Sequence, residues 1–145
     1  MTRQTQRGIG LLDALIALAI LAFGLLALTR FQGRMTSQST DAQARHTANR
    51  LADELVSLAL VDAANVGCYT LPAAGTCGNA AVRTNTNAWL TRVTSSLPGS
   101  ATATVTAAAP PNPAEGGTRL TILISWTSKD ESADARQLVT VTNVQ

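Results

Sequence analysis

The chain has 145 residues, of which 46% are hydrophobic and 14% are charged, and its formal net charge is +2. This excess of positive charge does not indicate a nucleic-acid partner. Removing the first eight residues, which contain Arg3 and Arg7, leaves nine basic and nine acidic residues. A single histidine and the absence of clustered nucleophiles and bases argue against an enzyme, so no catalytic residue, metal or cofactor is expected.

The first predicted element is an apolar helix, residues 9–28. Its only charged residue is Asp13, and its length of about 30 Å matches the hydrocarbon core of a bilayer. A short leader with Arg3 and Arg7 precedes it. The small residue Gly8 stands before the apolar segment, whereas an ordinary secretory signal has its cleavage site after that segment. Cleavage after Gly8 would keep the helix, so we expect a membrane anchor with its leader in the cytoplasm.

Asp13 indicates a function for this helix, because a carboxylate in hydrocarbon costs about 2.5 to 3.5 kcal/mol on insertion scales. Residues 9–28 contain no cation, but cleavage after Gly8 would create an ammonium group on Ile9, about 6 Å away along the axis. The pair could form within one chain or between staggered helices, where it would also fix their axial register. We expect pairing between chains; the alternative is a carboxylate that reaches interfacial water.

The stretch RGIGLLD, residues 7–13, followed by an unbroken apolar helix, resembles the class III signal of type IV prepilins and type II secretion pseudopilins. The resemblance covers the first thirty residues. It implies cleavage after Gly8 by a membrane prepilin peptidase, N-methylation of Ile9, and a role in subunit assembly for Asp13, where the family usually has Glu. It also implies a Gram-negative inner-membrane protein with a periplasmic head. Such a protein later joins a pilus at the cell surface and contacts other minor pilins and the major pilin through its helix.

The next segment, residues 29–62, is predicted to continue the same helix in amphipathic form, since apolar residues recur every three or four positions and no proline precedes Pro72. One helix is expected from about Ile9 to about Leu60, with its second half packed on a globular head of residues 63–145. His46 is expected to be solvated, and the adjacent Asp53 and Glu54 to be surface charges and not metal ligands. The expected core positions are Ala44, Ala48, Leu51, Leu55, Leu58 and Val61.

The segment from Cys68 to Thr86 shows no periodic apolar face and is predicted to be a loop. Its two cysteines lack a nearby histidine, a CxxC motif or a second cysteine pair, which makes them a poor metal site. In an exported chain we therefore expect a Cys68–Cys77 disulfide, with free buried thiols as the alternative.

The remaining sequence predicts a short helix and three strands. The stretch NTNAWLTRVTSSLPG, residues 85–99, has an Asn or Thr cap, an apolar face and a terminal Pro-Gly. Alternating patterns predict strands at 101–109, 119–126 and 137–144, with a charged hairpin end between the last two. The fold class is thus α+β, a long helix on a small antiparallel sheet, with Trp89 and Trp126 in the core and not stacked on a ligand.

This order of elements, with Trp89, the Leu97-Pro98-Gly99 turn and Trp126, resembles the minor pilins called type IV pilus modification protein PilV. The resemblance implies the type IV pilin fold and a structural, assembly-priming tip subunit that supports pilus biogenesis, adhesion or twitching motility. Two alternatives stay open. One is a type II secretion minor pseudopilin, similar to pseudopilin I, and the other is an unprocessed bitopic protein whose periplasmic domain binds a ligand.

Overall fold

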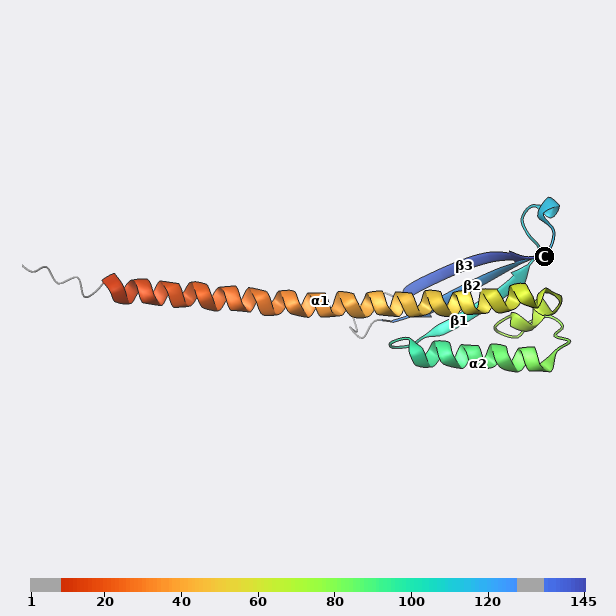
Figure 1. Cartoon of the computed structure of the whole chain (residues 1–145), viewed down its shortest axis with the longest axis horizontal. Coiled ribbons are helices and arrows are strands. Elements are labelled where there is room, and N and C mark those ends of the chain that lie inside the picture. The colour runs from red at the N-terminus through yellow and green to blue at the C-terminus, as the bar shows by residue number, and fades with distance from the viewer. Residues whose placement is uncertain (1–8, 128–134) are drawn as a thin grey trace, which may run out of the picture. The chain divides into compact units, whose positions relative to one another are not determined.

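The computed structural model describes residues 9–127 and 135–145, except for the side chains of Ile9 and Glu115. The predicted leader, with Gly8, and most of the predicted charged hairpin end lie outside the described residues. The chain divides into two compact units, one ending at Thr40 and the other beginning at Asp41. Its elements are α1 (Ile9–Val61), the 3-10 helix η1 (Ala63–Tyr69), α2 (Ala80–Ser96), β1 (Thr102–Ala108), the 3-10 helix η2 (Pro113–Glu115), β2 (Thr118–Trp126) and β3 (Arg136–Val144) (Figure 1).

The prediction of one long amino-terminal helix is confirmed, since α1 runs over 53 residues and ends one residue past the expected end. Its surface changes character along its length. Every described side chain from Gly10 to Thr40 is exposed, whereas from Asp41 onward one stripe of α1 is buried in the core of the second unit. The start of that stripe is Ala44.

The predicted core positions of α1 are right at Ala44, Ala48, Leu51 and Leu55 but wrong at two others. Leu58 is 43% exposed and Val61 is 90% exposed, while Ala52 and Ala59 are buried instead. On an ideal helix with about 100° between residues, the buried side chains lie within an arc of about 100°. Leu58 falls just outside that arc and Val61 falls about 80° outside it. Spacings of three and four therefore placed the last two predicted core positions outside the buried side of the helix.

The loop predicted over Cys68–Thr86 is wrong in its second half, because α2 already begins at Ala80. The side chain of Asn79 caps it by accepting hydrogen bonds from the backbone N–H groups of Ala81 (3.1 Å) and Val82 (3.3 Å). Thr86 lies on the buried face of α2, where its hydroxyl donates to the carbonyl of Val82 at 3.0 Å. A polar residue with a local partner can thus occupy a core position that apolar patterning does not show.

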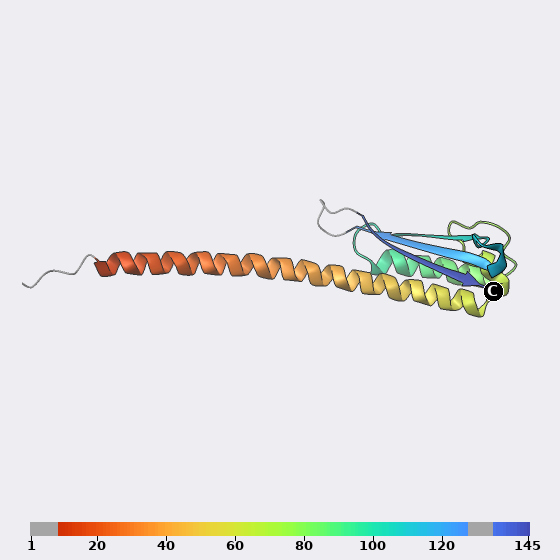
Figure 2. The same ribbon diagram turned by 90° about the horizontal axis from the view of Figure 1, so that it is seen from above.

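The three strands form one antiparallel sheet in the order β1-β2-β3, and each lies within one residue of its predicted bounds. Figure 2 shows this sheet on one side of the last turns of α1. The predicted inner face of β2 is confirmed, since its four apolar side chains are buried against α1 and α2. These are Leu120, Ile122, Ile124 and Trp126.

Trp89 joins the helices of the second unit. Its side chain is fully buried, and its Nε1–H donates to the backbone carbonyl of Leu51 in α1 at 2.9 Å. Trp126 is also buried, so the prediction that both tryptophans belong to the core is confirmed. Between α2 and β1 the chain turns at Gly99, which has a φ of 65°; a Cβ there would lie 2.2 Å from Oγ1 of Thr127, so only glycine fits.

Candidate functional site

The first candidate site is the amino-terminal part of α1. Its apolar side chains are exposed on every side of the helix, and Phe23 reaches 74%. Monomeric soluble proteins rarely expose a continuous apolar surface of this extent. By length and composition α1 can cross a membrane.

Asp13 is the fifth residue of α1, and it is exposed among these apolar neighbours. Within residues 9–127 and 135–145, its carboxylate has no ion pair and no hydrogen-bond partner. Gly8, the predicted cleavage position, lies outside the described residues, and of Ile9 only the helical backbone is described. That backbone places the nitrogen of Ile9 one helical turn, or about 6 Å along the axis, from Asp13.

The cysteines form the predicted disulfide, with Cα atoms 4.7 Å apart. Sequence reasoning missed the residue that fixes this loop to α2. The guanidinium of Arg83 donates to the carbonyls of Thr70 at 2.7 Å and Gly67 at 2.9 Å. The two cysteines are bonded to each other, so neither is a reactive thiol. The disulfide and the two hydrogen bonds of Arg83 together form a structural clamp on the loop.

Tyr69, one residue before Thr70, connects this loop to the carboxy-terminal end of α1. Its hydroxyl contacts the carbonyl of Leu58 at 3.2 Å and the carboxylate of Asp62 at 3.3 Å. Burial raises the pKa of Tyr69, and the negative charge of Asp62 and the hydrogen bond to that carboxylate raise it further. The phenol therefore stays protonated in the folded protein at ordinary pH.

A charged groove of about 280 Å³ lies between α1 and α2, lined among others by His46, Arg50 and Arg92. Arg92 forms an ion pair with Glu54 at its rim. His46, Asp53 and Glu54 are all exposed, which confirms them as solvated residues. An exposed pair of this kind contributes about 0 to 1 kcal/mol, so the groove adds little to stability.

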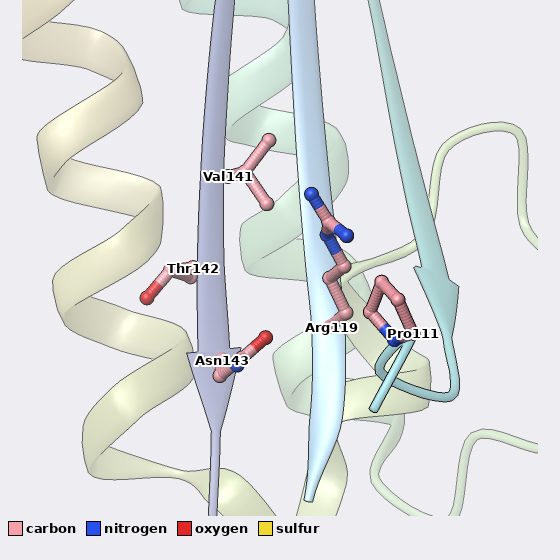
Figure 3. Close-up of a pocket in the computed structure, with 5 residues that line it drawn as sticks. All are labelled: Pro111, Arg119, Val141, Thr142 and Asn143. Carbon is pink, nitrogen blue, oxygen red and sulfur yellow. The ribbon is translucent and has the colours of Figure 1, made fainter. Parts of the chain in front are cut away.

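Two further hollows lie on the sheet. One of about 310 Å³ contains Arg119 and Pro111 beside Val141 and Asn143, while Thr142 points toward α1 (Figure 3). The other, of about 640 Å³, lies between the disulfide loop and β1 and has mainly small side chains. Neither is lined by the nucleophile and base that acyl transfer or hydrolysis needs. Within the described ranges, no three His, Cys, Asp or Glu side chains form a group that could hold a metal ion.

Comparisons with protein-family models, with curated proteins and with solved structures find no match for this chain. The fold and the first site nevertheless define a class. The chain is an α+β protein with an amino-terminal helix that can span a membrane and a disulfide-bonded head with a three-stranded antiparallel sheet.

Proposed function

We propose that this chain is a minor pilin of a type IV pilus, cleaved after Gly8 by prepilin peptidase and N-methylated on Ile9. After processing, it acts as a structural subunit that helps to prime assembly at the pilus tip. The observation that carries the proposal is the position of Asp13. It is the single charged residue of the exposed apolar segment 9–28, and it has no partner among the described residues. The long α1 and the small antiparallel sheet support it, because they match the layout that the sequence resemblance implies.

The physical role of Asp13 follows from the cost of its charge. In hydrocarbon a carboxylate is stabilised most by a nearby cation, and α1 has none from Ile9 to Leu28. The ammonium group on a neighbouring Ile9 supplies that cation when two helices pack with a stagger of one turn. The apolar side chains around it then exchange lipid contacts for contacts with other helices, which packing and interhelical pairing favour.

Substitution of Asp13 tests the proposal. We expect Asp13→Ala to insert and to be cleaved normally, because neither step requires the carboxylate, but to be depleted at least tenfold from sheared pili. Asp13→Glu keeps the charge and should assemble at least as well as the wild type. Mass spectrometry of the amino terminus and quantification of the subunit in pilus fractions measure both steps. Full incorporation of Asp13→Ala, or an intact leader on molecules recovered from pili, would contradict the proposal.

A type II secretion minor pseudopilin is the second candidate, because Asp13 and α1 support it equally well. A deletion strain separates the two functions. Loss of surface pili with normal enzyme secretion supports the minor pilin, and normal piliation with lost secretion supports the pseudopilin. A third function, ligand binding by an unprocessed bitopic protein, requires Met1 to be retained in cells with active prepilin peptidase.

A further inference from the structure

Two arginines follow the apolar part of α1 directly. Arg30 and Arg34 lie about 3 Å and 9 Å of helix beyond Leu28, the last residue of the apolar segment. The headgroup region of a bilayer extends about 5 to 7 Å beyond its hydrocarbon core on each side. If Leu28 lies at the edge of the hydrocarbon, the guanidinium of Arg30 is at the level of the lipid phosphates. Arg34 can reach the same level because its side chain is long.

The described residues supply no counter-charge for these arginines. No Asp or Glu occurs between Asp13 and Asp41, and Asp41 is already paired with Arg136. Across the residues that the structure describes, neither Arg30 nor Arg34 makes an ion pair or a side-chain hydrogen bond, and both are exposed. Within residues 9–127 and 135–145, these two cations are therefore open to a partner of opposite charge.

The shape of the helix surface suits a phosphate between them. Arg30 and Arg34, four residues apart, share one face with Gly33 and Ser37. Gly33 has no side chain, and a Cβ built on it would meet open space, so room is left beside the arginines. Phe31 lies on an adjoining face and remains exposed, so the apolar surface continues at this depth. An arginine fork binds phosphate oxygens in a bidentate way, which a lysine cannot do.

We propose that Arg30 and Arg34 bind the phosphate of an anionic phospholipid in the leaflet at the carboxy-terminal end of the apolar segment. This inference rests on one part of the proposed function, that α1 spans a membrane. The lipid contact sets the depth of the helix in the bilayer.

The test uses the full-length chain, reconstituted in phosphatidylcholine vesicles that contain spin-labelled phosphatidylglycerol. Electron paramagnetic resonance measures the association of the labelled lipid relative to phosphatidylcholine. We expect the wild type to prefer phosphatidylglycerol over phosphatidylcholine. Arg30→Gln should lower this preference about fivefold, and the double variant with Arg34→Gln should lower it about fivefold more. Arg30→Lys combined with Arg34→Lys should keep part of the preference, because the charge remains but the fork is lost.

The matched control is Arg45→Gln with Arg50→Gln, which removes the same charge from exposed positions on α1. These residues lie at least 25 Å of helix beyond Leu28, more than two Debye lengths at physiological salt, so the lipid preference should not change.

Protease protection measures insertion of the helix into the vesicles separately from lipid binding. Inserted wild-type protein without a phosphatidylglycerol preference overturns this inference and leaves the proposed function intact. Wild-type protein that does not insert overturns both. Loss of the preference on addition of inorganic phosphate at constant ionic strength would show a free-anion site in place of a lipid site.

Discussion

The two parts of α1 share one backbone conformation but differ in how their apolar residues are distributed. Up to Leu28, apolar side chains surround the helix, and every described side chain up to Thr40 is exposed. From Asp41 onward the buried apolar side chains occupy an arc of about 100°, which packs in the core of the head with α2 and the sheet. The width of the apolar surface thus shows where its partner lies. A stripe can be covered by the chain's own head, whereas a helix that is apolar all round requires lipid or other helices.

The two parts also differ in side-chain size. The buried arc contains four alanines, which let the sheet and α2 approach α1 closely, and two leucines that fill the space between them. A fully buried leucine such as Leu55 contributes about 1.5 to 3 kcal/mol to the stability of the head. Phe23, by contrast, is 74% exposed and belongs to the other compact unit, so it is no part of the core of the head.

The largest expected effect on the free energy of unfolding comes from comparing two side-chain truncations, one in the head and one in the exposed apolar part of α1. Trp89→Ala should lower the free energy of unfolding of the head by about 3 to 5 kcal/mol, because it leaves a cavity and removes the hydrogen bond to Leu51. Phe23→Ala, an equally drastic truncation, should change it by less than about 0.5 kcal/mol. Urea denaturation of the full-length chain in detergent, followed by the fluorescence of Trp126, measures both. Similar losses for the two variants would show that the two parts of α1 are not energetically separate.

The two parts of the molecule also differ in covalent cross-linking, because the Cys68–Cys77 disulfide lies in the head. Replacing Cys68 and Cys77 together by serine should lower the free energy of unfolding by about 2 to 3 kcal/mol, because the open chain gains conformational entropy when unfolded. The same denaturation assay measures the loss. Adding a reductant to the wild type should reproduce it, and the double variant should not respond to the reductant. A wild type that is insensitive to reduction would argue against a stabilising role for the clamp.

The smallest expected effect is a pH dependence of the free energy of unfolding, caused by Tyr69 at the end of α1. Because the pKa of Tyr69 is raised in the folded protein, its phenol ionises first in the unfolded chain. The contribution of Tyr69 is therefore complete below about pH 10 and is lost as the pH rises above that value. Tyr69→Phe should remove this loss, so the difference in stability between wild type and variant should be constant below pH 10 and shrink above it. Tyr69 is the chain's one tyrosine, so its absorbance titration gives an independent measurement, and a normal midpoint would contradict the raised pKa.

Much of the fold could be predicted from local patterns. The absence of proline before Pro72 and the continuous apolar composition predicted α1, and strict alternation predicted all three strands to within one residue. The start of α2 escaped prediction because residues 80–86 carry few apolar side chains and the cap is supplied by Asn79, which stands inside an apparently irregular segment. The clamp by Arg83 escaped for a similar reason, since its partners are backbone carbonyls that leave no trace in the residue types.

The importance of Asp13 at the candidate site could be predicted from residue types alone. A carboxylate within twenty apolar residues is visible without any structure, because its cost depends only on the surrounding composition. The structure adds that Asp13 is exposed and without a partner in the described chain.

By itself, the sequence determined the long helix, the strands, the disulfide partners and the charge within the apolar segment, because each depends on neighbours that are close along the chain. Only the tertiary structure decided which side of α1 is buried at its end, where Ala59 faces the core and Val61 does not. It also decided that Leu71 pairs with Val105 at the edge of β1, through backbone hydrogen bonds of 2.8 and 2.9 Å. Such contacts join segments more than thirty residues apart, and they depend on how the elements pack, which no local pattern records.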